Sequence, residues 1–485
     1  MRKHFEQQLS FHIKPISEVK IPTRSRDELP PVLAALQYVF VTPELNSQIF
    51  QILEDKIMKG KKKTGRTGMD LWEILVLATV RLTLDADYDR LLYTANFDIL
   101  TRQIMGVHSS YGEGKSYGLQ TLKDNMGLLD AETIDKINAI IVEHGQQFVL
   151  KKNEKLQIKS DTYVLETNVH FPTDYNLLWD SCRSAINMLK WIKKGYNLEG
   201  WRKTKDWHKK LKSAQRALGK ATAVGAKKEE HIKAMAEEYL RLASELLAKL
   251  NSTYLEILLL PSVAEKVKGE LKALKYYMEM IEKHIGLVKR RLINGEVIPT
   301  SEKIYSIFEN HTEWLSKGKI NKRVELGHKF LIATDQYNFI VYHKVIENQA
   351  DVQLTIGVAD ALLQKYPSRI QSMSFDKGFY SKENKELLAL EIPQVIMPKK
   401  GKLNLIEKEE EADKRFKKLR NKHSAVESNI NQLEHNGLNR CPDKGLRNFK
   451  RYASIGILSY NLHKFGKLIR EKAKVEPANQ LQTAA

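Results

Sequence analysis

Apolar residues in the first third of the chain recur at helical spacing. The clearest stripe, at the 3.6-residue period, comprises Leu71, Ile74, Leu75, Ala78 and Leu82. Asp70 stands where an N-cap residue would begin this helix, and Asp130 precedes a second apolar stripe in the same way. We therefore predict an all-helical N-terminal domain over residues 1–150.

From residue 156 the apolar period changes to two, which is typical of strands. Strand-like segments begin at Leu156 and recur at residues 324–332, 339–345, 370–375 and 392–398. Residues 184–300 are rich in Ala, Leu, Lys and Glu and interrupt the strands with a predicted helical insertion. The pattern thus predicts an α/β protein whose sheet is formed by residues 151–183 and 301–465, followed by a disordered tail at 466–485.

The charge of the chain favours a polyanionic partner. The 79 basic and 59 acidic residues give a formal net charge of +20, so nucleic acid is the first candidate and an anionic membrane surface the second. The longest apolar runs are far shorter than the ~20 residues of a membrane-spanning helix, and the N-terminus lacks a secretory signal. We expect a soluble, cytoplasmic protein, with Cys182 and Cys441 as buried structural thiols.

Two basic segments each allow two interpretations. The segment 58–68 is either a solvated loop or a phosphate-contacting loop, with Lys61, Lys62, Lys63 and Arg66 as the candidate contacts. In the insertion, three tryptophans are spaced among lysines: Trp191, Trp201 and Trp207. We favour a helical hairpin with these rings in its seam, and a DNA-binding or dimerising arm is the alternative.

Three carboxylates stand where a carboxylate is locally out of place. Asp161 interrupts a strand, Asp376 ends one, and Glu427 lies on the shoulder of a helix's apolar stripe. An unpaired carboxylate inside a sheet is costly, and a cation would explain all three positions. Such an all-oxygen set suits Mg²⁺, for which Mn²⁺ can substitute, and two such ions promote phosphodiester cleavage and strand transfer without a protein nucleophile.

Other acids compete for these roles. Glu434 lies two helical turns beyond Glu427 and is the chief rival for the third position. The rivals near the first acid are Glu166, Asp174 and Asp180, of which Asp174 is more simply a turn former. The neighbouring residues Thr167, Asn168 and His170 are candidates for lining a cleft, although a plain turn explains them equally well.

Four motifs in order resemble the DDE-type transposases of bacterial insertion sequences. They are SDTYVLETNVHFPTDYNLLWDSCR, VELGHKF, SFDKGFYSKEN and HSAVESNINQLEHNGLNRCPDKGL. The resemblance covers roughly residues 60–465 outside the insertion. It implies an RNase H-like core with a mixed sheet, preceded by a DNA-binding helical domain, and assigns Asp161, Asp376 and Glu427 as the catalytic acids.

The resemblance also implies partners and an activity. A transposase binds double-stranded DNA at the inverted repeats of its element and at the target, works as a homodimer, and associates with the bacterial nucleoid. Candidate phosphate contacts near the third acid are Arg420 and His423, and those in the C-terminal basic segment are Arg447, Lys450 and Arg451. The lysine that such enzymes often carry seven residues after the third acid is replaced here by Glu434. A metal-dependent nuclease without strand transfer and an inactive DNA-binding protein are the alternatives.

Overall fold

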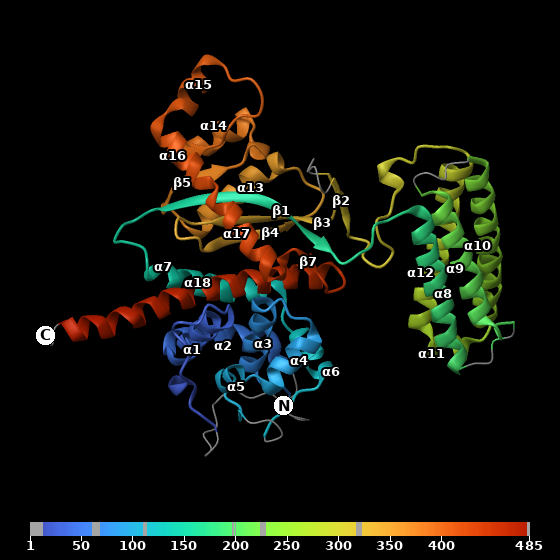
Figure 1. The fold of residues 1–485 in the computed structure, drawn as a ribbon, viewed down its shortest axis with the longest axis horizontal. Helices are drawn as coiled ribbons and strands as arrows, with labels where there is room; N and C mark the ends of the chain where they lie inside the picture. Colours follow the sequence, from blue (N-terminus) through green and yellow to red (C-terminus); the bar gives the residue numbers. More distant parts are fainter. Residues whose placement is uncertain are drawn as a thin grey trace. The chain divides into compact units, whose positions relative to one another are not determined.

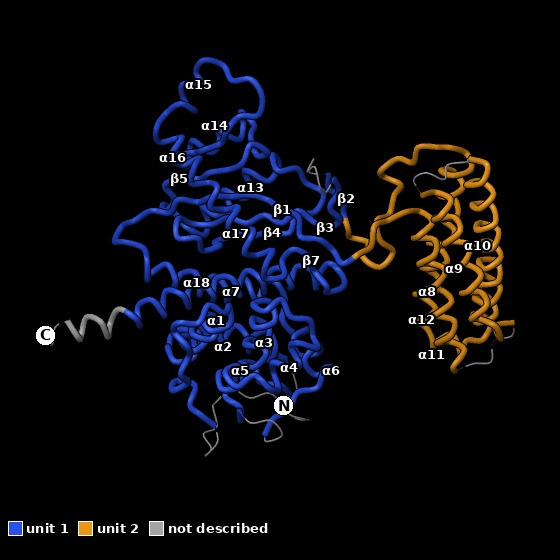
Figure 2. The backbone as a smooth tube through the Cα atoms, in the orientation of Figure 1, with its two compact units in different colours: residues 1–168, 313–485 blue, residues 169–312 orange. Residues whose placement is uncertain are grey.

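The structure is a computed structural model of the chain, and it describes residues 13–60, 68–109, 114–195, 198, 200–223, 229–316 and 323–482. It divides into two compact units, which Figure 2 colours separately. Unit 1 comprises residues 1–168 and 313–485, and unit 2 comprises residues 169–312.

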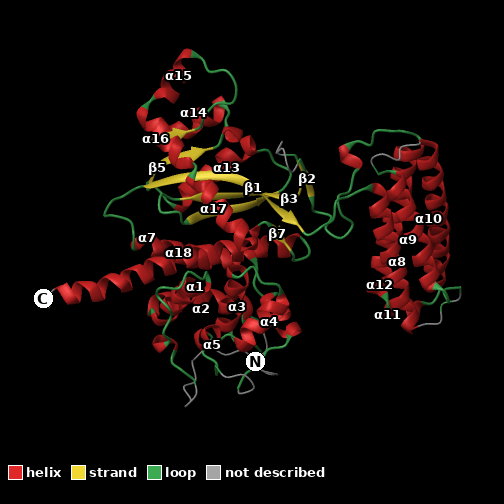
Figure 3. Cartoon of the chain, in the orientation of Figure 1, coloured by secondary structure: helices red, strands yellow, loops and turns green. Residues whose placement is uncertain are grey.

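Unit 1 is built on a mixed seven-stranded sheet, as the alternating pattern led us to expect of an α/β protein (Figure 3). Its strands are β1 (Leu156–Thr167), β2 (Glu313–Leu315), β3 (Glu325–Thr334), β4 (Ile340–Ile346), β5 (Ile370–Phe375), β6 (Gln394–Ile396) and β7 (Arg440–Cys441). The order is β2-β3-β1-β5-β6, with β4 also paired to β3 and β7 to β1. β1 pairs antiparallel with β3 and parallel with β5, so the longest strand is central.

Helices cover both faces of this sheet (Figure 1). The helices and 3-10 or π turns from β4 onward are α13 (Asp351–Lys365), η4 (Lys377–Phe379), α14 (Lys382–Glu391), α15 (Leu405–Ala412), α16 (Lys414–His423), α17 (Ala425–Leu433), η5 (Glu434–Leu438) and α18 (Leu446–Gln482). On one face, Thr162 of β1 donates a hydrogen bond to Asp351 of α13 at 3.4 Å. On the other face, Tyr460 of α18 donates to the carbonyl of Asn338 at 3.2 Å.

Two of the N-terminal helices begin where local signals predicted. The helical elements of this region are η1 (Ile16–Glu18), α1 (Leu29–Val41), α2 (Pro43–Ile57), α3 (Leu71–Thr83), α4 (Tyr88–Phe97), α5 (Ile99–Ile104), α6 (Leu119–Met126) and α7 (Ala131–Gln147). Asp70 caps α3 through a capping box with Glu73. Asp130 caps α7 by accepting a 3.0 Å hydrogen bond from the backbone N–H of Thr133. Both predicted caps are confirmed.

These helices share one core with the sheet, which corrects the expectation of a separate domain at residues 1–150. A single cluster of buried apolar side chains extends from Ile16 to Phe465 and includes residues of β1, β3 and β5. Asn461 of α18, which is fully buried, bonds both the N–H and the carbonyl of Ile340 at 2.9 Å. It also donates to Asn138 of α7 at 2.8 Å. The long C-terminal helix therefore joins the two layers, through partners that no local pattern could reveal.

Unit 2 is a helical bundle with its own core. Its elements are α8 (Asp174–Gly195), α9 (Thr204–Ala221), α10 (Glu229–Leu258), α11 (Pro261–Lys266), α12 (Lys268–Val288), η2 (Lys289–Ile293) and η3 (Thr300–Glu302). The insertion is thus confirmed as helical, but it spans 169–312 rather than 184–300. Trp201 is buried and donates to Thr253 at 2.7 Å, whereas Trp191 is 62% exposed. The seam interpretation therefore holds for Trp201 and fails for Trp191.

Three further findings concern the C-terminal helix, the two cysteines and the hydrophobicity of the helices. Helix α18 continues through Arg470 and Lys474, so at least residues 466–474 are helical rather than disordered. Cys182 and Cys441 are free and buried, as predicted. None of the helices in the described ranges is long and apolar enough to cross a membrane.

Candidate active site

The first two predicted acids lie side by side at the centre of the sheet. In the parallel pairing of β1 with β5, Lys159 is opposite Ser374 and Ser160 is opposite Phe375. The next residue along each strand is Asp161 or Asp376, and Asp376 retains extended backbone angles (φ −73°, ψ 164°). Neighbouring strands lie about 4.8 Å apart, and paired residues project to the same face. The register therefore places the two carboxylates on one face of adjacent strands.

That face is the one covered by α16 and α17. Two residues before the acids, Lys159 and Ser374 line a cavity of about 300 Å³ together with Lys422 of α16 and Ser428 of α17. Because side chains along a strand alternate with period two, Asp161 projects to the same side as Lys159. Asp161 is half-buried, and its Oδ1 accepts a 2.7 Å hydrogen bond from the N–H of Thr162.

The third predicted acid lies on the helix that packs against this face. α17 buries Val426, Asn429 and Leu433 and leaves Glu427 exposed in its first turn. Asn429 contacts Asn338 at 3.5 Å. Among the described residues, no group of three or more His, Cys, Asp or Glu side chains is arranged to hold a metal ion. The structure thus places Asp161 and Asp376 on adjacent strands and Glu427 on a neighbouring helix, but these three described residues do not form a metal-binding group.

Glu434, the rival for the third position, lies close to the same strand. It is half-buried at the start of η5, directly after α17. Burial, followed by the charge of Glu434, raises the pKa of Tyr163, which stands two residues after Asp161 on β1. Both Glu427 and Glu434 therefore lie on elements next to the acid-bearing face.

A buried lysine projects to the same face as the two acids. Lys159 is 7% exposed, and its Nζ donates to Oδ1 of Asn338 at 3.3 Å. Burial lowers the pKa of Lys159, and Asp335 opposes that shift. Sequence reasoning missed Lys159, although its spacing of two from Asp161 in a strand predicts a shared face.

His423 occupies the boundary between α16 and β5. Its Nδ1 shares a 2.9 Å hydrogen bond with Oγ of Ser374, and its buried Nε2 has no hydrogen-bond partner within the described ranges. Burial lowers the pKa of His423, against the opposing charge of Asp376. The imidazole of His423 therefore lies within electrostatic reach of one of the two acids.

The rival acids near β1 have other partners. Glu166 pairs with Arg440 at 3.2 Å. Asp174 belongs to unit 2, where it pairs with Arg291 at 3.0 Å. Thr167 donates to the carbonyl of Leu326 at 3.3 Å, and Asn168 lines a separate cavity with Glu166. These contacts explain Glu166 and Asp174 without a metal.

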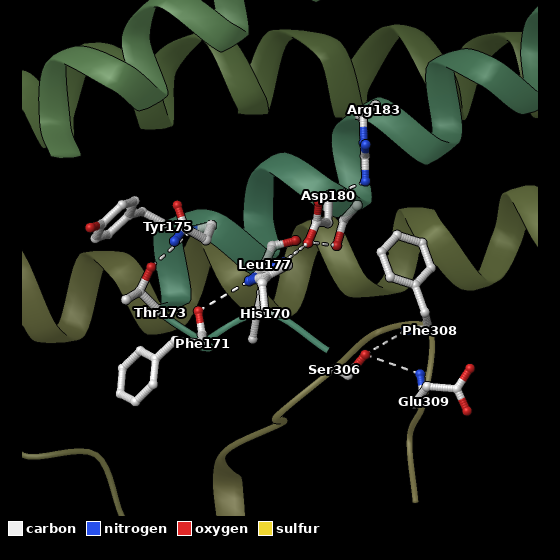
Figure 4. Close-up of polar contacts among 12 residues, drawn as sticks. His170, Phe171, Thr173, Tyr175, Leu177, Asp180, Arg183, Ser306, Phe308 and Glu309 are labelled. Atoms are coloured by element: carbon white, nitrogen blue, oxygen red, sulfur yellow. Dashed lines mark hydrogen bonds and ion pairs between the residues drawn. The ribbon is translucent and has the colours of Figure 1, made fainter. Parts of the chain in front are cut away.

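Asp180 and His170 form a polar cluster inside unit 2 (Figure 4). The Asp180 carboxylate contacts Nε2 of His170 at 2.6 Å and Arg183 at 2.9 Å. The hydrogen bond with Asp180 raises the pKa of His170. On a neighbouring loop of the same unit, the Ser306 hydroxyl accepts from the N–H of Glu309 at 3.0 Å. Asp180 therefore has basic partners within the insertion.

The predicted DNA contacts differ in their accessibility. Lys61, Lys62, Lys63 and Arg66 lie outside the described residues. Arg447 is exposed, as is Arg420, which contacts Glu411 at 3.5 Å. Lys450 is half-buried and pairs with Glu347 at 2.6 Å.

The prediction that Arg451 contacts DNA is wrong. Arg451 is 8% exposed and pairs with Asp443 at 3.0 Å. Asp443 also pairs with Arg81 at 2.7 Å. Because this buried triad joins α3 to the C-terminal segment, Arg451 is a structural cation rather than a DNA contact.

No known protein family, curated protein or solved structure matches the chain.

Proposed function

We propose that this protein is a DDE-type DNA transposase, with Asp161, Asp376 and Glu427 as the residues that hold its catalytic metal ions. The observation that carries the proposal is the register of β1 and β5, which sets Asp161 beside Asp376 on one face. The strand arrangement also supports an RNase H-like core. β4, β3 and β1 are antiparallel neighbours, whereas β1, β5 and β6 are parallel.

The donor set fits a hard divalent cation. Two adjacent carboxylates, with a third on a packed helix, offer the oxygen ligands that Mg²⁺ and Mn²⁺ prefer. Bound Mg²⁺ supplies charge stabilisation for the attacking and leaving oxygens of a phosphodiester. Lys159 and Lys422 line the same face and present positive charge toward a DNA backbone. Asn338 holds the Nζ of Lys159 and so orients it.

The proposed substrate is double-stranded DNA, at the ends of an insertion sequence and at its target. The formal charge of +20 supports a polyanionic partner. Bringing two ends together requires two copies of the active site, so we propose a homodimer as the working form. A nuclease without strand transfer would use the same acids, and the two activities differ in whether the cleaved 3′ end is joined to a second duplex.

Paired cleavage and binding assays test the proposal. Asp161→Asn and Asp376→Asn should each abolish Mg²⁺-dependent cleavage of a duplex taken from the DNA that flanks the gene, while a gel shift in EDTA still shows binding. Asp360→Asn is the matched control, because this exposed residue of α13 undergoes the same change. Cleavage by Asp161→Asn at the wild-type rate would refute the site.

The same assays show whether Glu427 or Glu434 is the third catalytic acid. Glu427→Gln should eliminate cleavage, and Glu434→Gln should retain it. The opposite result would transfer the third role to Glu434. Incubation of the wild-type protein with a second duplex then separates the two activities: joined products indicate a transposase, and hydrolysis alone indicates a nuclease.

A further inference from the structure

A second cavity lies in unit 1, between the start of α1 and the C-terminal helix. Its volume is about 360 Å³. One wall is the segment 23–27 with Pro31, and the other is a face of α18 between His463 and Lys474. The α18 residues that line it are spaced at three, four and seven positions, so they share one side of the helix.

This cavity is strongly basic. Two acidic side chains line it. The basic side chains that line it are five: Arg24, Arg26, Lys467, Arg470 and Lys474. One of the acids, Asp27, is already engaged, because its Oδ1 accepts a 2.8 Å hydrogen bond from the N–H of Leu29 at the start of α1. Like charges gathered around one space disfavour each other, and a bound anion would relieve that repulsion.

Arg470 gives the cavity a buried donor. Its side chain is 92% buried, since 8% is exposed, and its Nη2 donates to the carbonyl of Ser25 at 3.1 Å. Its buried Nε has no hydrogen-bond partner in the part of the chain that the structure describes. Leaving a buried charged donor without a partner is energetically costly. A planar guanidinium is suited to the oxygens of a phosphate group.

Close packing holds the two walls of the cavity in place before any ligand binds. A Cβ on Gly466 would lie 1.7 Å from the carbonyl oxygen of Pro31, so α18 approaches the first turn of α1 as closely as only glycine permits. Nearby, Nε2 of His463 pairs with Glu28 at 2.7 Å, and this hydrogen bond lowers the pKa of Glu28. A preformed site loses little entropy when it binds its ligand.

We propose that this cavity, with Arg470 at its base, is a phosphate-binding site that takes a backbone phosphate of duplex DNA. The choice of DNA as the source of the phosphate rests on the proposed function, whereas anion binding does not. A structural link supports DNA as the source. On α18, Tyr460 donates to the carbonyl of Asn338 at 3.2 Å, and Asn338 accepts from Nζ of Lys159 at 3.3 Å, so the same helix reaches the acid-bearing face. DNA held at the cavity therefore lies along the helix that contacts this face.

A matched pair of lysines on α18 provides the test. Lys467 lines the cavity, whereas Lys472 lies outside the lining, with its Nζ 4.5 Å from the ring centre of Phe148. Affinity for a fluorescent duplex is measured in EDTA over a range of salt concentrations. Lys467→Gln should lower the slope of log K against log salt by about 0.9, and Arg24→Gln with Lys467→Gln by about 1.8. Lys472→Gln should leave the slope near that of wild type.

Inorganic phosphate and a nucleoside monophosphate serve as separate probes in calorimetry. Weak or undetectable binding of both, together with the reduced DNA slopes, supports the proposal. An unchanged DNA slope in Arg24→Gln with Lys467→Gln overturns it. Tight binding of either small probe, lost in Lys467→Gln while the DNA slope is unchanged, also overturns it and assigns the cavity to a free phosphate compound. These binding measurements are made in EDTA and do not depend on cleavage. Failure of the separate Mg²⁺-dependent cleavage assay would therefore refute the proposed function without affecting this result.

Discussion

Substitution of Gly466 by alanine should destabilise unit 1, despite the higher helix propensity of alanine. The added Cβ would lie 1.7 Å from the carbonyl oxygen and 2.5 Å from the carbonyl carbon of Pro31, both of which are backbone atoms. Relief requires α18 to move from α1 by more than an ångström, and overpacking of this kind costs about 1–3 kcal/mol or more. The gain in helix propensity, roughly 1 kcal/mol, offsets only part of that cost.

Gly357 provides the control for this substitution. It lies on α13 of the same unit, and its Cβ would have no neighbour within 4 Å. Gly357→Ala should therefore stabilise the protein by about 0.5–1 kcal/mol. Urea denaturation followed by far-ultraviolet circular dichroism gives both free energies of unfolding. If Gly466→Ala is as stable as Gly357→Ala, the close packing of α18 on α1 is refuted.

Two further predictions concern buried and paired charges. Asp443→Asn should lower the free energy of unfolding by about 3–5 kcal/mol, because it leaves Arg81 and Arg451 buried without a counter-ion. Burial opposes the shift, but Arg81 and Arg451 hold the pKa of Asp443 below its ordinary value, so this stabilisation is present above the unfolded pKa and declines as the pH falls through the folded pKa. Denaturation midpoints of wild type and variant that fall in parallel on acidification would contradict this. In unit 2, Asp180→Asn should lower the pKa of His170 toward its ordinary value, because the Asp180 hydrogen bond raises it; an unchanged NMR titration of His170 would contradict the pairing. Since the folded pKa of His170 is raised, the contribution of this pair to stability is complete below the unfolded pKa and is lost as the pH rises through the folded pKa.

Features set by nearby residues could be predicted from the sequence. Asp70 and Asp130 were identified as caps because a cap depends on residues within one helical turn. The alternation around Asp161 likewise predicted a strand, and the structure shows β1 there. The helical composition of residues 184–300 predicted a helical insertion, which is unit 2.

Features set by distant partners could not be predicted. Arg451 looked like a surface cation because nothing near it in sequence shows that Asp443 also pairs with Arg81, 362 residues away. The predicted start of the insertion at residue 184 is too late, because Asp174, which follows Pro172 and Thr173, has the sequence pattern of a turn former but begins α8. The prediction of a separate N-terminal domain is also wrong because of distant partners. Asn461 of α18 forms hydrogen bonds with residues of α7 and β4 that are far from it in sequence.

Binding of Mn²⁺ tests the central claim most directly, since Asp161 and Asp376 are proposed to hold one divalent site together. Calorimetric titration of Mn²⁺ into the protein bound to duplex DNA should show saturable binding in the wild type and in Asp360→Asn. Asp161→Asn and Asp376→Asn should each weaken it by roughly tenfold or more, as expected when a charged ligand is lost from a metal site. Undiminished Mn²⁺ binding by both variants would contradict the claim that these neighbouring carboxylates form the metal site.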